Sequence, residues 1–186
     1  NPAAPSLFTA SESMKNGGSL LIAQIFGQPA FTISPAFLWA ATSFQTLFSP
    51  WAADAYDAAR FAGVVFTAIG LTACGFAGFN FLGRHHGRSV VLILIGSIGL
   101  LPIAHFLNPM SADFAAFGLI LCGFSLARRR VIIAILLLCG GWVLLSLSSG
   151  YLLTAAMMFL ALALSFQSTW QSKRYLLTLI GTIVVS

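Results

Sequence analysis

Charged residues are scarce in this chain, and their scarcity excludes several classes of protein. Of 186 residues, nine are Lys or Arg and four are Asp or Glu, so charged residues make up 7% of the sequence. Nucleic-acid binding, binding of acidic substrates and a disordered tail all need clusters of charge that this composition does not supply. Hydrophobic residues make up 59%, and the mean hydropathy is +0.95. This composition predicts a membrane protein that binds no nucleic acid.

Cysteine pairs and short catalytic motifs are also lacking. The three cysteines, Cys74, Cys122 and Cys139, lie inside apolar segments without Cys-x-x-Cys or Cys/His spacing. We interpret them as small buried hydrophobic residues and not as disulfide partners or metal ligands. The sequence contains no nucleophile elbow, phosphate loop or metal motif. We therefore expect no metal site and no evident cofactor.

Long apolar runs after residue 60 predict an all-α fold, namely a polytopic bundle of transmembrane helices. A helix that crosses the bilayer needs about 20 apolar residues. The runs predict five to six spans, at residues 61–82, 89–107, 114–127, 131–149 and 152–166, with a truncated last helix at 175–186. Pro102 is expected to kink or interrupt the second span. Because the last run is short and the chain does not begin with Met, we expect a fragment of a longer protein.

Residues 1–60 differ from the rest, because prolines and glycines cut their apolar sequence into pieces too short to span a membrane. Short amphipathic helices are expected at 11–14 and 19–24, and a longer interfacial helix, anchored by Trp39, at 36–48. A short loop is expected at 108–113. The predicted organisation is an external loop with juxtamembrane helices at 1–60 and a transmembrane bundle at 61–186.

Basic residues concentrate in the turns between expected spans, and this predicts the orientation. Seven of the nine Lys and Arg residues fall on one side: Arg84, Arg88, Arg128, Arg129, Arg130, Lys173 and Arg174. The positive-inside rule makes that side cytoplasmic. All four acids, Glu12, Asp54, Asp57 and Asp113, fall on the opposite, external side together with residues 1–60. Chemistry that needs a carboxylate is therefore expected on the external side.

Asp113 and Arg60 are the charged residues considered for that chemistry. Asp113 is expected at the start of a span, where a carboxylate is either a functional residue or a stabiliser of the helix N-terminus. Asp54 and Asp57 lie on one face of the turn that precedes Arg60. A local ion pair between Asp57 and Arg60 is the favoured interpretation, and paired-carboxylate catalysis is the alternative.

Several short matches, in order along residues 3–130, carry a resemblance to a known family. In that family, the stretch corresponding to residues 27–39 usually reads Gly-x-Pro-Tyr-Phe-Glu-Lys-Pro-Pro-Leu-Tyr-Tyr-Trp, which matches this chain at Gly27, Pro29, Phe31, Pro35 and Trp39. A span that ends in Gly-Arg-His-His-Gly-Arg at 83–88 and a loop that ends at residue 113 follow in the same order. The chain thus resembles the lipid-linked-sugar glycosyltransferases of the GT-C type. Within this type it resembles glycosyltransferase family 39, which includes aminoarabinose transferase and protein O-mannosyltransferases.

The resemblance implies an enzyme of the bacterial inner membrane that holds a polyprenyl-phosphate sugar in a cavity at its external face. An external acid would activate the acceptor or hold a divalent metal, and basic residues would bind the lipid phosphate. The family's motif Asp-Glu-x-Arg-Tyr falls on residues 3–7, Ala-Ala-Pro-Ser-Leu, and its Glu-Lys pair falls on Thr32 and Ile33. Those acids, the arginine and the lysine are therefore missing. The retained candidates are Asp113 as the catalytic acid and Arg60 as the lipid-phosphate ligand.

Two main hypotheses follow. The first is a divergent relative of the lipid-linked-sugar transferases, non-catalytic because its usual acids are replaced, with membrane lipids and a polyprenyl-phosphate sugar as partners; a divalent metal enters only if it is active. The second is an accessory subunit of a larger membrane complex. Gly75/Gly78 and Gly140/Gly141 permit close helix contacts either within the chain or with other membrane subunits. A transporter is a third possibility, with little support because Asn80 and His105 are the only strongly polar residues expected within spans.

Overall fold

Helices make up most of the computed structural model, which describes residues 4–17, 23–25, 28–30, 34–49, 54–83, 85–97, 107–127 and 129–165. In chain order the elements are α1 (Ala4–Lys15), β1 (Ala23–Ile25), β2 (Gln28–Ala30), α2 (Pro35–Phe48), α3 (Ala55–Leu82), α4 (His86–Gly96), α6 (Met110–Leu126), α7 (Val131–Ser149) and α8 (Tyr151–Ser165). The predicted helical class is confirmed. In the described part of the chain, the one sheet is the short antiparallel pair β1–β2, with Ala23 opposite Ala30.

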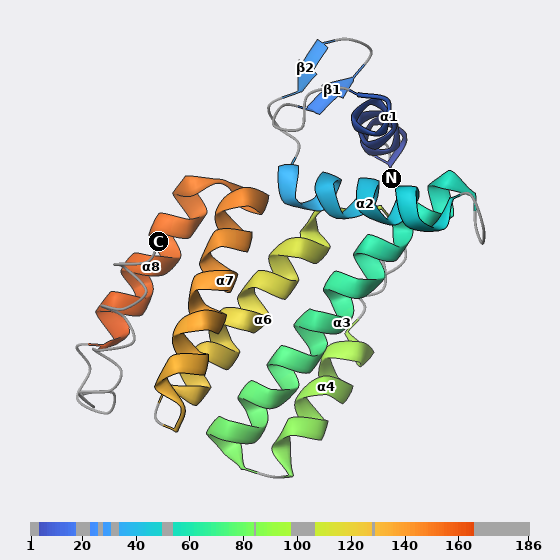
Figure 1. Ribbon diagram of the computed structural model, residues 1–186. Coiled ribbons are helices and arrows are strands. Elements are labelled where there is room, and N and C mark those ends of the chain that lie inside the picture. Colours follow the sequence, from blue (N-terminus) through green and yellow to red (C-terminus); the bar gives the residue numbers. More distant parts are fainter. Residues whose placement is uncertain are drawn as a thin grey trace.

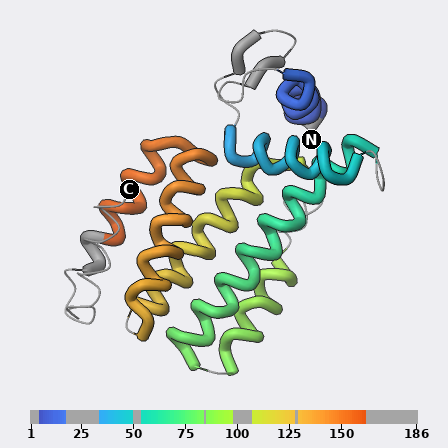
Figure 2. The backbone as a smooth tube through the Cα atoms, viewed as in Figure 1, coloured from blue at the N-terminus to red at the C-terminus, as the bar shows by residue number. Residues whose placement is uncertain are grey.

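The body of the molecule is a row of packed helices (Figures 1 and 2). α6 lies between α3 and α7, α8 packs against α7, and α4 packs against the C-terminal half of α3 (Figure 1). Glycines set the closest approaches. A Cβ added to Gly118 of α6 would lie 2.9 Å from the Gly70 carbonyl oxygen of α3, and one added to Gly123 would lie 3.1 Å from the Ala134 carbonyl oxygen of α7. The helix backbones therefore touch where no side chain separates them.

Most of the glycines that permit close helix contacts are used within the chain. A Cβ on Gly75 or Gly78 would lie 2.7 Å from Val91 Cγ2 or 2.8 Å from Val90 Cγ2, both on α4. Gly141 meets Ile120 of α6 in the same way, at 2.7 Å. Gly140 differs, because an added Cβ there meets no described atom within 4 Å. The alternative between contacts within and between chains is thus resolved for three of these four glycines.

Helices α1 and α2 lie over one end of the row, which we call the covered end. There α2 crosses the N-terminal end of α3 (Figure 1), and Ser34 at its start donates a hydrogen bond to the Leu147 carbonyl of α7, at 3.2 Å. Proline suits the first position of α2 because that N–H has no acceptor within the helix. The apolar core of the covered end consists of Leu7, Ala10, Met14, Phe37, Leu38, Ala41, Ala59, Ala62 and Leu107. The opposite end, where Gly83, Ala127, Arg129 and Arg130 lie, is called the open end.

Helix boundaries agree with the sequence-based prediction in some places and differ in others. The predicted helices at 36–48, 131–149 and 152–166 correspond to α2, α7 and α8. The predicted helix at 19–24 is wrong where the structure describes it, because Ala23 and Gln24 belong to β1. The predicted loop at 108–113 is wrong over its last four residues, because residues 110–113 form the first turn of α6. That helix starts early because Asn108 Oδ1 accepts a hydrogen bond from the Met110 N–H, at 3.1 Å.

Two described helices, α3 and α7, are long and apolar enough to cross a membrane, judged by length and composition. α4, α6 and α8 are apolar but shorter, with 11, 17 and 15 residues. Several predicted features lie outside the described residues: the kink at Pro102, the last helix at 175–186, His105, Arg84, Arg128, Lys173 and Arg174. The described chain is thus a helical protein with two helices of spanning length.

Candidate functional site

In the part of the chain that the structure describes, charged side chains occur at the two ends of the helix row and not between them. The sequence has no Asp, Glu, Lys or Arg in residues 61–82, 114–127 or 131–165, which form most of α3, α6, α7 and α8. All four acids lie at the covered end: Glu12 in α1, Asp54 directly before α3, Asp57 in the first turn of α3 and Asp113 in the first turn of α6. Among the described residues, the open end carries His85, His86, Arg88, Arg129 and Arg130. Acid chemistry therefore has one place in the described structure, the covered end.

Asp113 lies in the first turn of α6, at the covered end. Its Oδ1 atom is buried and accepts no hydrogen bond from any described residue. The start of α6 is held by other groups, since Met110 N–H donates to Asn108 Oδ1 at 3.1 Å and Ser111 Oγ donates to the Asn108 carbonyl at 2.9 Å. A buried carboxylate oxygen without a hydrogen-bond partner costs free energy, so no capping hydrogen bond accounts for this oxygen. The carboxylate also lies in the first turn of α6, where a negative charge favours the helix dipole. Asp113 remains the candidate acid of the site.

Ser148, near the end of α7, also has a buried and unpaired polar atom, its Oγ. α6 and α7 run antiparallel, with Gly141 between Ala116 and Ile120 and Gly123 between Ala134 and Leu138. Two turns beyond Gly141 and Ile120, this register puts Ser148 near the level of Asp113. Two unpaired oxygens on adjacent helices therefore face the same layer of the covered end. A carboxylate and a hydroxyl at one level can together hold a ligand hydroxyl, because the carboxylate accepts a proton and the hydroxyl both donates and accepts.

Arg60 lies on α3 and is held by its own helix. Its Nη1 donates to Asp57 Oδ1 at 3.3 Å, and its guanidinium lies 6.0 Å from the centre of the Tyr56 ring. The predicted Asp57–Arg60 ion pair is confirmed. α3 and α6 run parallel, with Gly70 against Phe114 and Gly118, so Arg60 lies between one and a half and roughly two turns beyond the level of Asp113. The two candidate residues share the covered end but lie at different depths.

A polar cluster at the open end was not predicted from the sequence. Asn80 of α3 donates to Ser125 Oγ of α6 at 3.4 Å, and Arg129 donates to Asn80 Oδ1, also at 3.4 Å. Ser125 Oγ in turn donates to the Cys122 carbonyl at 2.7 Å. Asn80 stands out in the sequence as the one strongly polar residue of its apolar run. Its partners depend on how α3 and α6 align, which the sequence does not show.

Neither a metal-binding group among the described residues nor a similar known protein helps to interpret the site at Asp113. Within the described ranges, no three His, Cys, Asp or Glu side chains are grouped so that they could hold a metal ion. Cys74 and Cys122 are buried free thiols, and Cys139 is a half-buried one. No protein-family model, curated protein or solved structure matches this chain. The site is therefore interpreted from its own residues.

Proposed function

We propose that this chain is a polytopic integral membrane protein in which α3, α4, α6, α7 and α8 lie in the bilayer and α1 and α2 lie along one of its surfaces. The support is the uncharged middle of the helix row, whose surface exposes large apolar side chains on each of these helices. They include Val64, Phe76, Leu92, Leu121, Ile132, Leu136 and Phe159. Soluble monomers rarely expose contiguous apolar patches of more than a few hundred Å². In a bilayer the same side chains contact lipid.

Helix lengths are compatible with this placement. The 19 residues of α7 extend over about 28 Å, close to the ~30 Å of the bilayer core. α3, with 28 residues, extends over about 42 Å, so it either tilts or projects from the membrane with its charged first turn. By the positive-inside rule the open end faces the cytoplasm. The covered end then faces the outside of a bacterial inner membrane.

Cysteine labelling tests this orientation. In a variant with all three native cysteines replaced by Ala, we expect Lys15→Cys to react with a membrane-impermeant maleimide in right-side-out vesicles. Arg130→Cys is expected to react only after the vesicles are permeabilised. The reverse pattern would contradict the orientation, and equal labelling of both variants in sealed vesicles would contradict the membrane placement.

The function that this geometry supports best is binding of a polyprenyl-phosphate sugar by a divergent, non-catalytic relative of the lipid-linked-sugar transferases. The observation that carries it is the sheltered, unpaired Oδ1 of Asp113 at the covered end. This oxygen can accept a hydrogen bond from a sugar hydroxyl, and Arg60 at the same end is the candidate for the phosphate. The acids and the lysine of the resembled family correspond here to Ala3, Ala4, Thr32 and Ile33. A site with one acid lacks the arrangement of charges that stabilises a transition state.

Liposomes that contain the protein and a radiolabelled polyprenyl-phosphate sugar separate binding from transfer. We expect the labelled lipid to co-purify with the protein, and we expect no transfer above that of empty liposomes. Asp113→Asn should lower retention roughly tenfold, because a hydrogen bond to a charged group is lost. Lys15→Gln, an exposed change at the same end, is the control and should not lower it. Robust transfer that Asp113→Ala abolishes would overturn the non-catalytic assignment, and lack of retention would overturn binding.

An accessory subunit is the second candidate, favoured by one face of α7. Gly140 meets open space, and Ile132, Leu136 and Val143 are exposed on the same face at spacings of three and four residues. A glycine flanked by large apolar residues suits close contact with a helix of another membrane protein. Co-purification of a partner at fixed stoichiometry in mild detergent, lost with Gly140→Leu and kept with Val64→Leu, would support this role. A monodisperse monomer would contradict it.

A further inference from the structure

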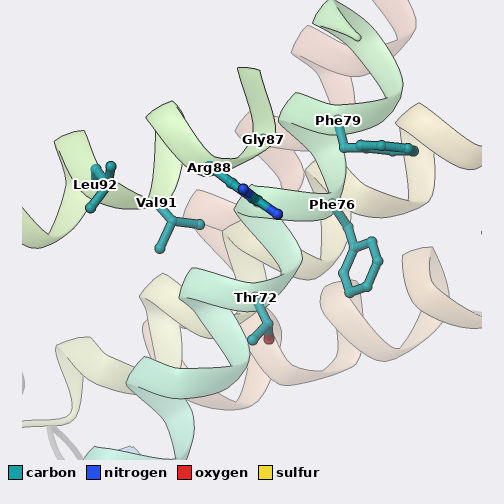
Figure 3. A pocket seen from close by; sticks show the side chains of 8 residues that line it. Thr72, Phe76, Phe79, Gly87, Arg88, Val91 and Leu92 are labelled. Carbon is teal, nitrogen blue, oxygen red and sulfur yellow. The ribbon is translucent and has the colours of Figure 1, made fainter. Parts of the chain in front are cut away.

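A groove of about 610 Å³ lies between α3 and α4 near the open end (Figure 3). Its apolar lining includes Phe76 and Phe79 of α3 and Val91 and Leu92 of α4, and Arg88 of α4 also lines it. The volume falls within the roughly 300–1,000 Å³ that small-molecule sites occupy. The groove is far from the covered end and therefore separate from the site of Asp113.

Glycines explain why the surface is hollow at this place. A Cβ added to Gly87 of α4 would lie 2.9 Å from the Gly75 carbonyl oxygen of α3, so the two backbones touch there. Both glycines line the groove. Beside the two glycines, the side chains of Phe76 and Leu92 are 64% and 68% exposed. The groove is therefore bordered by large apolar side chains, and its base is formed by glycines. The groove is thus an apolar depression at the side of the helix row.

Arg88 adds a positive charge that no described residue neutralises. Its side chain is exposed and extends from α4 toward α3 (Figure 3). Within the described residues it forms no ion pair or hydrogen bond, and all four acids of the sequence lie in elements of the covered end. His85 and His86 are exposed in the same turn. A guanidinium without a described partner, beside an apolar groove, is complementary to a ligand with an anionic head group and a hydrocarbon tail.

We infer that the groove between α3 and α4 binds one anionic phospholipid, with an acyl chain against Phe76 and Leu92 and the phosphate on Arg88. Arginine suits this role because its planar guanidinium donates two parallel hydrogen bonds to a phosphate. Basic sites between membrane helices on the cytoplasmic side bind anionic lipid headgroups. The inference depends on the proposed membrane placement and orientation, and it is independent of any binding of a lipid-linked sugar.

Native mass spectrometry of the full chain tests whether the positive charge of Arg88 binds the lipid phosphate. The protein is reconstituted in equimolar phosphatidylglycerol and phosphatidylcholine and then transferred to mild detergent. We expect one phosphatidylglycerol molecule to stay bound in preference to phosphatidylcholine. Arg88→Gln should lower its retention about tenfold, while Arg88→Lys should keep most of it. Arg130→Gln removes an exposed charge at the same end, outside the groove, and should leave retention unchanged.

A second variant tests whether the lipid occupies the apolar part of the groove. Thr72 is exposed and lines the groove, so Thr72→Phe should fill it and displace the lipid although Arg88 is intact. The proposal is overturned if Arg88→Gln retains lipid as well as the natural sequence, if Arg130→Gln loses as much, or if Thr72→Phe has no effect. Flotation of the same liposomes on a density gradient distinguishes a failure of lipid binding in the groove from a failure of the membrane placement. Protein that floats without retaining lipid contradicts only the groove, whereas protein that does not float contradicts the membrane placement.

Discussion

The covered end and the open end of the helix row differ in the burial of their polar side chains. At the covered end, Gln45 is fully buried and donates to Ser11 at 3.0 Å, and Asp113 Oδ1 is shut away from solvent. At the open end Arg88 and Arg130 are exposed, and Arg129 reaches Asn80 across an exposed hydrogen bond. The difference comes from α1 and α2, which add a second layer over one end. Where α1 and α2 cover the helices, polar groups are buried and costly to change. Where the described helices end in open turns, charged side chains remain exposed.

The largest effect is expected when the apolar core of the covered end is opened. Phe37 is fully buried and its ring centre lies 6.3 Å from that of Phe66. Phe37→Ala should lower the free energy of unfolding by about 3–5 kcal/mol, because it leaves a cavity. The measurement is unfolding by denaturing detergent in mixed micelles. Phe76→Ala, at an exposed position near the open end, is the matched control and should cost less than about 1 kcal/mol. Equal losses would show that the two ends do not differ as described.

A buried hydrogen bond at the covered end should come next. Ser11→Ala leaves Gln45 Nε2 without its acceptor and should cost about 1–3 kcal/mol. The double variant Ser11→Ala with Gln45→Met should recover part of this loss, because both polar partners are then gone. The same unfolding measurement checks it. A double variant less stable than the single one would mean that Gln45 holds the covered end by other contacts.

At the open end, the hydrogen bonds of Asn80 should contribute less. Asn80→Ala removes two contacts of 3.4 Å, to Ser125 and from Arg129, and a 2.9 Å hydrogen bond to the Phe76 carbonyl of its own helix, and should cost about 1 kcal/mol or less. Thr72→Ala is the control, since that hydroxyl donates only to carbonyls of its own helix. A loss as large as that of Ser11→Ala would remove the distinction between the ends.

The smallest effect is expected for the ion pair on the surface of the covered end. The side chains of Arg60 and Asp57 are 39% and 58% exposed, so solvent screens their attraction. Asp57→Asn should change the unfolding free energy by about 0.5 kcal/mol or less. In high salt the natural sequence and the variant should become equally stable. A difference that persists in high salt would indicate a role for Asp57 besides this pair.

How much was predictable depends on the range of the interaction. The helix at Val131–Ser149 and the Asp57–Arg60 pair were predicted correctly, because an apolar run and an i,i+3 spacing are local. Residues 110–113 were expected in a loop and are helical, since the hydrogen bond from Met110 N–H to Asn108 Oδ1 starts the helix earlier than the apolar pattern does. The partners of Asn80 and the unpaired Oδ1 of Asp113 were not predictable. They depend on which turns of α3, α6 and α7 lie side by side.

The sequence by itself determined that the chain is helical and that residues 61–82, 114–127 and 131–165 carry no charge, and it predicted that the acids and most basic residues lie at different ends. Those properties follow from composition and periodicity along the chain. Only the tertiary structure decided that Gly75 and Gly87 let α3 and α4 touch beside a groove, and that α2 lies over the start of α3. Such contacts require two helices to approach at one particular register. Many registers bury apolar helices about equally well, and glycines and buried polar groups select among them only after the helices meet.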